Sequence, residues 1–150
     1  MEKFHFEEEE SEIGMARPMI AHNFVEFLIC KFFGKIWGSK QSFQKKYIPA
    51  NEEPVTNNRD TLTPDFTIKD RKTRKTKLLI EITKSVDDEQ EKIKIYKLMG
   101  IEAEMFVYNY LQNKWYKANE EGNLEENSYS DLFKCFFNEA TDPYIDPYMI

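Results

Sequence analysis

A strand, a helix and a second strand in the middle of the chain constrain the fold most. Leu78 to Thr83 alternates apolar side chains with the period of two that is typical of a strand. A helix is expected from about Asp88 to Met99, where Gly100 supplies the stop, and a strand from Met105 to Tyr108 follows. Because a helical connection lets two strands lie parallel, this unit predicts an α/β fold with a mixed sheet flanked by helices.

Further helices and strands are expected on both sides of this unit. Asp87 or Asp88 can cap the central helix, and a turn from Tyr110 to Asn113 predicts a hairpin. The other expected elements are a helix from Arg17 to Phe33 with Pro18 in its first position and Gly34 at its end, strands at Phe43–Ile48, Asp65–Lys69 and Lys114–Lys117, a loop at Pro49–Arg59, and a short helix from Ser130, its cap, to Phe137.

Size and composition favour one domain over residues 1–150. A hydrophobic content of 41% allows a core of its own, with a polar, acidic arm at about 1–16, loose or a short edge element, and a tail at about 139–150. Cys30 and Cys135 lie far apart in apolar surroundings, which favours buried reduced thiols. The most apolar stretch is too short to cross a bilayer, so we expect a soluble, cytoplasmic protein without membrane contact.

Two acids in the strand region are the candidate catalytic residues. Asp65 opens one apolar run, and Glu81 stands inside the next, on the strand face opposite Ile80 and Ile82. If a hairpin joins the two runs, both carboxylates can meet at one end of the sheet. Carboxylate oxygens suit Mg²⁺ or Mn²⁺, and such an ion can polarise a phosphate and activate water. The pair therefore predicts a metal-dependent nuclease.

A strongly basic turn connects these two runs. The net charge of −6 opposes a polyanionic partner, but the positive charge of this turn is concentrated in one short stretch beside the acids. The alternative is a solvated turn that only maintains solubility. The candidate nucleic-acid-binding residues are Lys69, Arg71, Lys72, Arg74, Lys75 and Lys77.

Pro64-Asp65 followed by Glu81-Ile82-Thr83-Lys84 resembles the PD-(D/E)XK nuclease superfamily, which has a restriction-endonuclease-like core. Most of residues 10 to 138 is similar to the Uma-type restriction endonucleases of bacteria. The positions that carry this wider resemblance are Met15-Ala16, His22-Asn23, Pro64-Asp65, Leu79 to Ile82, Asp88, Lys92, Tyr96, Gly100-Ile101 and Phe106 to Tyr108.

The resemblance implies that Asp65 and Glu81 bind the metal, with the carbonyl of Ile82 as a further ligand. The superfamily pattern places a lysine two residues after Glu81, where this chain has Thr83, and Lys84 projects to the opposite face unless the strand bends. Some branches supply the lysine from the following helix, which makes Lys92 the better candidate for assisting the attacking water. The alternative is an exposed Lys92 paired with Asp88 at i,i+4.

His22 and Glu26 share one face of the first predicted helix, where either can reach toward the cation. The alternative for His22 is a structural hydrogen bond near the start of that helix. A helix histidine, Thr63-Pro64-Asp65, Glu81-Ile82-Thr83 and Lys92 also resemble the histidine-containing cap-snatching endonucleases of segmented negative-strand RNA viruses. This family is the second choice.

Three functions follow from these residues. The first is an Mg²⁺- or Mn²⁺-dependent endonuclease acting on nucleic acid, with DNA favoured over RNA. The second is a nuclease-like binding or assembly domain without catalysis, suggested by Thr83 at the lysine position. The third is a viral cap-snatching RNA endonuclease domain. A homodimer through the acidic arm or the tyrosine-rich tail is compatible with each.

Overall fold

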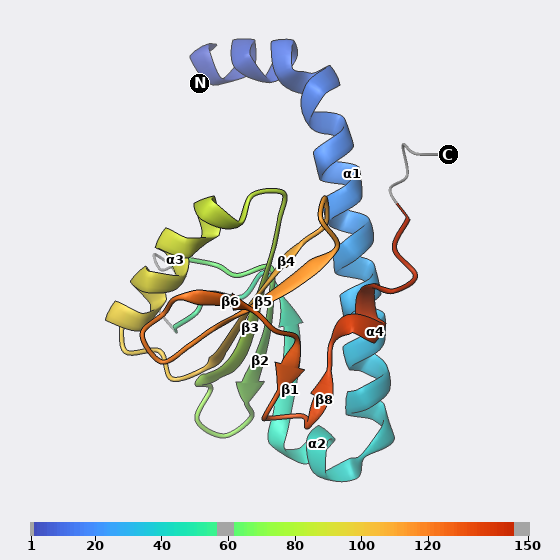
Figure 1. The fold of residues 1–150 in the computed structure, drawn as a ribbon, viewed down its shortest axis with the longest axis vertical. Coiled ribbons are helices and arrows are strands. Elements are labelled where there is room, and N and C mark those ends of the chain that lie inside the picture. Colours follow the sequence, from blue (N-terminus) through green and yellow to red (C-terminus); the bar gives the residue numbers. More distant parts are fainter. Residues whose placement is uncertain (1, 57–61, 146–150) are drawn as a thin grey trace.

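The computed structural model describes residues 2–56 and 62–145, with side chains from residue 19 onward (Figure 1). The end of the predicted Pro49–Arg59 loop and the end of the tail lie outside these residues. The elements in chain order are α1 (Glu2–Ser39), α2 (Gln41–Lys46), β1 (Tyr47–Asn51), β2 (Phe66–Asp70), β3 (Thr76–Thr83), α3 (Val86–Leu98), β4 (Glu104–Asn109), β5 (Lys114–Ala118), β6 (Leu124–Glu126), β7 (Tyr129–Ser130), β8 (Cys135–Phe136) and α4 (Asn138–Thr141).

A six-stranded mixed sheet in the order β1-β2-β3-β4-β5-β6 forms the centre of the fold. Neighbouring strands are antiparallel except β3 and β4, which are parallel because α3 connects them. Helix α1 covers one face of the sheet and α3 the other (Figure 1). The predicted α/β class, the central crossover and the β4–β5 hairpin are therefore confirmed.

Strand β3 is buried on both faces, as a central strand between two helices must be. Its even-numbered residues Leu78, Ile80 and Ile82 belong to the core under α1. Leu79 belongs to the smaller core under α3. The predicted division of faces is confirmed, and it directs Glu81, which is only 1% exposed, toward α3.

Helix α1 is longer than predicted at both ends. Residues 2–16, expected to be a loose arm or a short edge element, have helical backbone, because their glutamates are good helix formers near a helix N-terminus. Pro18 therefore lies within the helix rather than at its start. Gly34 does not end it either, because the indole N–H of Trp37 donates to the Tyr47 carbonyl oxygen at 2.9 Å and holds the last turns in place.

Two sequence-based assignments near the ends of the sheet are wrong. The expected strand at Phe43–Ile48 is a short helix, α2, followed by β1. Phe43 lies on α2 and reaches the core from there by packing against Phe133. The expected helix from Ser130 to Phe137 is a small hairpin of β7 and β8. The carboxylate of Glu104 holds this turn by accepting hydrogen bonds from the Ser130 hydroxyl and from backbone N–H groups.

Helix α3 begins at Val86, two residues before its predicted start at about Asp88. Ser85, rather than Asp87 or Asp88, occupies the N-cap position, and the two aspartates lie in the first turn, where negative charge is favourable. The helix ends as predicted, with Gly100 at a φ of +78° directly after it.

Both cysteines are free thiols, although each is half-buried rather than fully buried. Within residues 2–56 and 62–145, no helix combines the length and the apolar character needed to cross a membrane.

Candidate metal centre

Asp65 and Glu81 meet where β2 begins. The antiparallel register pairs Phe66 with Ile80, so Asp65 lies opposite Glu81. The Asp65 N–H donates to Oε1 of Glu81 at 3.3 Å, and the Ile82 N–H donates to Oδ2 of Asp65 at 2.7 Å. The proximity expected from the sequence is thus present, whereas the role of both acids as ligands stays a prediction, as does that of the Ile82 carbonyl.

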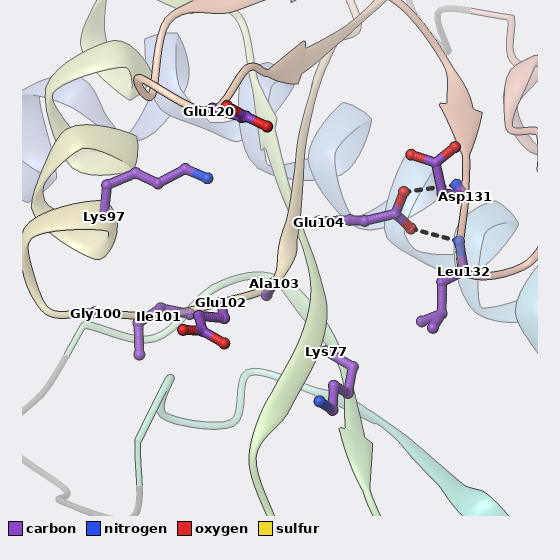
Figure 2. Close-up of a pocket in the computed structure, with 10 residues that line it drawn as sticks. All are labelled: Lys77, Lys97, Gly100, Ile101, Glu102, Ala103, Glu104, Glu120, Asp131 and Leu132. Atoms are coloured by element: carbon purple, nitrogen blue, oxygen red, sulfur yellow. Dashed lines mark hydrogen bonds between the residues drawn. The ribbon is translucent and has the colours of Figure 1, made fainter.

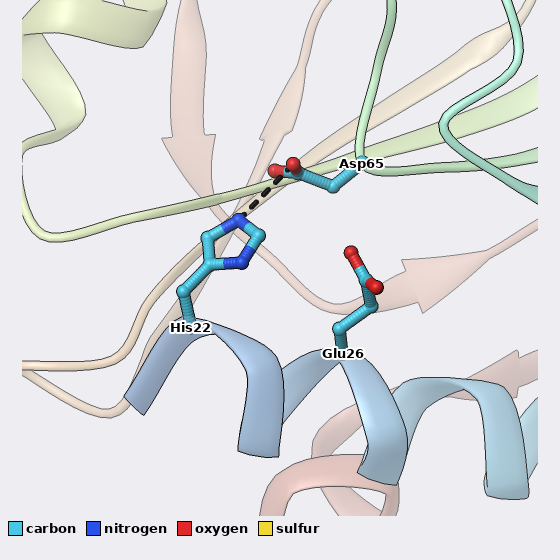
Figure 3. A group of neighbouring side chains, drawn as sticks. All are labelled: His22, Glu26 and Asp65. Carbon is cyan, nitrogen blue, oxygen red and sulfur yellow. Dashed lines mark ion pairs between the residues drawn. The ribbon is translucent and has the colours of Figure 1, made fainter. Parts of the chain in front are cut away.

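Helix α1 brings His22 and Glu26 to the same place. Nε2 of His22 lies 3.0 Å from Oδ1 of Asp65, and this hydrogen bond raises the pKa of the imidazole although burial opposes the charge. His22, Glu26 and Asp65 each offer a ligand atom, and these atoms lie within 4.8 Å of one another (Figure 3). We call these three residues the candidate ligand group.

One oxygen of the candidate ligand group has no hydrogen-bond partner in the part of the chain that the structure describes. Oε2 of Glu26 is buried and accepts no hydrogen bond from the described part of the chain. Burial, assisted by the charge of Glu52, raises the pKa of this carboxyl. Because a buried carboxylate without a partner is costly, a cation shared with His22 and Asp65 would relieve this cost. The imidazole and carboxylate donors therefore fit a divalent metal ion.

Helix α3 holds Glu81 from the other side. The ammonium of Lys92 lies 2.8 Å from Oε2 of Glu81, and the hydroxyl of Tyr96 donates to the same oxygen at 2.8 Å. Burial raises the pKa of Glu81 to about 7, while Lys92 opposes the rise and Asp65 adds to it. Burial also works against the charge of Lys92, but the Glu81 carboxylate raises the pKa of Lys92 overall. Glu81 is therefore poised to titrate near neutral pH.

Lys92, rather than Lys84, meets the acids. Lys84 is exposed, whereas Lys92 pairs with Glu81 and not with Asp88, its alternative partner in the sequence. Thr83 has a structural task at the position where the superfamily pattern has lysine. Its hydroxyl donates to the Ser85 carbonyl oxygen and accepts from the Ser85 N–H, both at 2.9 Å, which fixes the turn that starts α3.

Glu89 is a site residue that the sequence reasoning missed. Its Oε2 is buried and has no hydrogen-bond partner among the described residues, and burial raises the pKa of its carboxyl. The charge of Glu89 also contributes to raising the pKa values of Glu81 and Lys92, so it faces the same centre. One feature of the sequence could have indicated it: Glu89 lies three residues before Lys92, on the helix face that buries Ile93 and Tyr96.

The basic turn lies at the far end of the β2–β3 hairpin, not beside the acids as predicted. Asp65 precedes β2, whereas the turn follows Asp70. Two of the six candidate cations are already engaged: the ammonium of Lys69 donates to the Pro54 carbonyl oxygen at 2.7 Å, and the guanidinium of Arg71 donates twice to that of Gln44. Contact of the turn with nucleic acid stays a prediction.

The domain is thus a mixed α/β fold with an acidic centre between its two covering helices. It is similar over part of its length to a solved structure, that of the type IIG restriction endonuclease BpuSI, with 17% identity and a TM-score of 0.44. The match covers 65% of this chain and 11% of that enzyme, so the chain spans about a ninth of its length. No protein-family model matches the sequence, and no curated protein matches it.

Proposed function

We propose that this chain is a divalent-metal-dependent endonuclease that hydrolyses phosphodiester bonds in nucleic acid. The observation that carries the proposal is the convergence of His22, Glu26 and Asp65 on one point, with a buried oxygen of Glu26 that has no hydrogen-bond partner among the described residues. The PD-(D/E)XK resemblance of Pro64-Asp65 and Glu81 supports the same chemistry.

The candidate ligand group would hold Mg²⁺ or Mn²⁺, with Glu81 and the Ile82 carbonyl as further ligands. When bound, such an ion polarises a phosphate oxygen and lowers the pKa of an attacking water. The Ile82 N–H keeps Asp65 in one orientation, because it occupies Oδ2 and leaves Oδ1 facing His22. The protein thereby fixes its donors before the substrate arrives.

Lys92 would act on the substrate rather than on the fold alone. It reaches the centre from α3 with an exposed side-chain fraction of 28%, so it can contact both Glu81 and a molecule from solvent. Its positive charge would orient the attacking water and offset the charge that develops on the phosphate. Tyr96 keeps the Glu81 carboxylate in place during this contact.

Whether the substrate is DNA or RNA depends on which of the two family resemblances applies to this chain. The wider sequence similarity to Uma-type restriction endonucleases favours DNA. The contact between His22 and Asp65 favours the second candidate, an RNA endonuclease domain of the histidine-containing cap-snatching type. Parallel digestion of single-stranded RNA, single-stranded DNA and duplex DNA of one sequence separates these two candidates.

A catalytically inactive, nucleic-acid-binding or assembly domain is the remaining alternative. Thr83 at the lysine position motivates it, and the contact of Lys92 with Glu81 argues against it. Calorimetric titration with Mn²⁺ distinguishes the two. Binding of Mn²⁺ to an active centre releases or absorbs heat, and this heat should be absent in Asp65→Asn. A homodimer and a cytoplasmic location stay predictions, and light scattering tests the first.

The direct test is cleavage by the purified protein with Mn²⁺. We expect activity in the native chain and in the control Asp87→Asn, which changes an exposed acid of α3, but not in Asp65→Asn. Cleavage that survives in Asp65→Asn at the native rate would remove the proposed centre.

A further inference from the structure

A cationic cavity lies at the opposite end of the sheet from the candidate metal centre. It has a volume of about 330 Å³, and among the described residues its lining includes Arg74, Lys75 and Lys77 but only one acid, Glu102. The chain as a whole carries a net charge of −6. A concave site with excess positive charge on an acidic protein selects an anion. We call it the basic cavity.

Arg74 enters the basic cavity from a strained backbone. Its φ is +63°, in the left-handed region where glycine and asparagine are favoured. An arginine at such a position, on the rim of a cavity, suggests that its side chain is used. Lys69 and Arg71 are bound to backbone carbonyl groups, so the cations on the cavity side of the turn are the better phosphate ligands.

A larger neighbouring groove does not compete for an anion. Figure 2 shows this groove of about 790 Å³, which shares Lys77 and Glu102 with the basic cavity. Its other charged residues are Lys97, Glu104, Glu120 and Asp131, so its carboxylates outnumber its lysines. Glu104 is already engaged by the backbone N–H groups of Asp131 and Leu132. A polyanion is therefore directed to the basic cavity.

The strand connects the basic cavity to the acids. Lys77 and Glu81 are four residues apart on β3, which separates them by about 13 Å along the strand, and the register with β2 shifts at Lys77. Stacked nucleotides advance about 3.4 Å each along a strand, so this distance corresponds to at least about four nucleotides. Because α3 packs on Leu79 between the two places, a nucleic-acid strand that reaches both has to pass around α3, and the distance along β3 is a lower limit for its path.

We propose that the basic cavity binds backbone phosphates of a nucleic-acid strand, at least about four nucleotides from the bond held at Asp65 and Glu81. This inference rests on the proposed function for the identity of the polyanion. It assigns binding to Arg74, Lys75 and Lys77, and it gives the protein a minimum substrate length.

The test measures binding without cleavage. Fluorescence anisotropy in buffer with a chelator follows a labelled single strand of about 20 nucleotides and a labelled trinucleotide, each as DNA and RNA. The variant is Arg74→Gln with Lys75→Gln, and the control is Lys31→Gln with Lys35→Gln, which removes the same charge from exposed positions of α1.

We expect the cavity variant to bind the long strand about tenfold more weakly, while the control stays within about twofold of the native protein. The slope of log affinity against log salt should fall by about 1.4, because about 0.7 is lost for each phosphate contact to a single strand. In the native protein the trinucleotide should bind more weakly than the long strand, since a trinucleotide does not span the distance between the basic cavity and the acids. Arg74→Gly, which suits the positive φ, should weaken binding without lowering the melting temperature.

Equal affinity and equal salt slope in the cavity variant and the native protein would overturn the inference, as would failure of the native protein to bind the long strand. The proposed function fails separately. If the native protein binds through the basic cavity but does not cleave with Mn²⁺, the cavity inference stands and the endonuclease does not.

Discussion

Replacement of Glu81 by glutamine should remove a loss of stability that the metal-free protein undergoes as pH rises from 4.5 to about 7. Glu81 is 1% exposed, and burial raises its pKa from the usual 4.5 to about 7. The difference between these values corresponds to about 3 kcal/mol, since one pKa unit is about 1.4 kcal/mol. The charged carboxylate in the folded state costs this amount once pH exceeds 7, whereas glutamine carries no charge.

The direction follows from proton binding. Between pH 4.5 and about 7 the folded protein keeps the Glu81 proton that the unfolded chain has lost, so rising pH removes stability. Glu81→Gln has no such proton, and its free energy of unfolding relative to the native protein should rise by about 3 kcal/mol across this range. The same variant should lose Mn²⁺-dependent cleavage.

Urea unfolding in metal-free buffer, followed by the fluorescence of Trp37 and Trp115, measures this difference between pH 4.5 and about 8. Glu125→Gln, at an exposed position of β6, is the matched control and should show a constant difference from the native protein. If the difference for Glu81→Gln also stays constant within about 0.5 kcal/mol, the carboxyl is not held at a raised pKa and the reasoning is refuted.

Three further predictions test the centre and the core. Asp65→Asn should weaken Mn²⁺ binding at least about 100-fold in calorimetry, and retention of native affinity would exclude Asp65 as a ligand. Lys92→Met should lower kcat about 100- to 1,000-fold, and a larger loss in Lys84→Met would reverse the assignment of the lysine. Phe33→Ala, at 1% exposure, should cost about 3–5 kcal/mol in urea unfolding, whereas Phe27→Ala, at 61% exposure, should stay within about 0.5 kcal/mol; equal effects would contradict the described core.

The local sequence pattern was sufficient to predict a segment when its buried residues recur with the period of its own secondary structure. The alternation in β3 and the stop at Gly100 gave the central crossover and directed Glu81 to the face of α3. Local pattern failed where a distant residue decides the backbone. Ser130 to Phe137 reads as a capped helix, but the carboxylate of Glu104, from the end of another strand, holds its N–H groups in a turn.

The residues of the candidate metal centre likewise fall into those that could be chosen from the sequence and those that could not. Asp65 and Glu81 could be chosen from the sequence, since a carboxylate in an apolar strand needs a partner. Glu89 could not, because a glutamate on a charged helix looks like any solvated residue until the helix is docked. The basic turn was placed beside the acids because the two are close in sequence, but the hairpin separates them along the strands.

By itself the sequence determined the strand and helix periods of the central unit and its acidic pair, because these depend on residue type and spacing. Only the tertiary structure decided that α1 brings His22 and Glu26 to Asp65, that Lys92 rather than Lys84 meets Glu81, and that the basic cavity is remote. These depend on how helices dock across a sheet and on strand register, which are set by contacts between residues far apart in the chain.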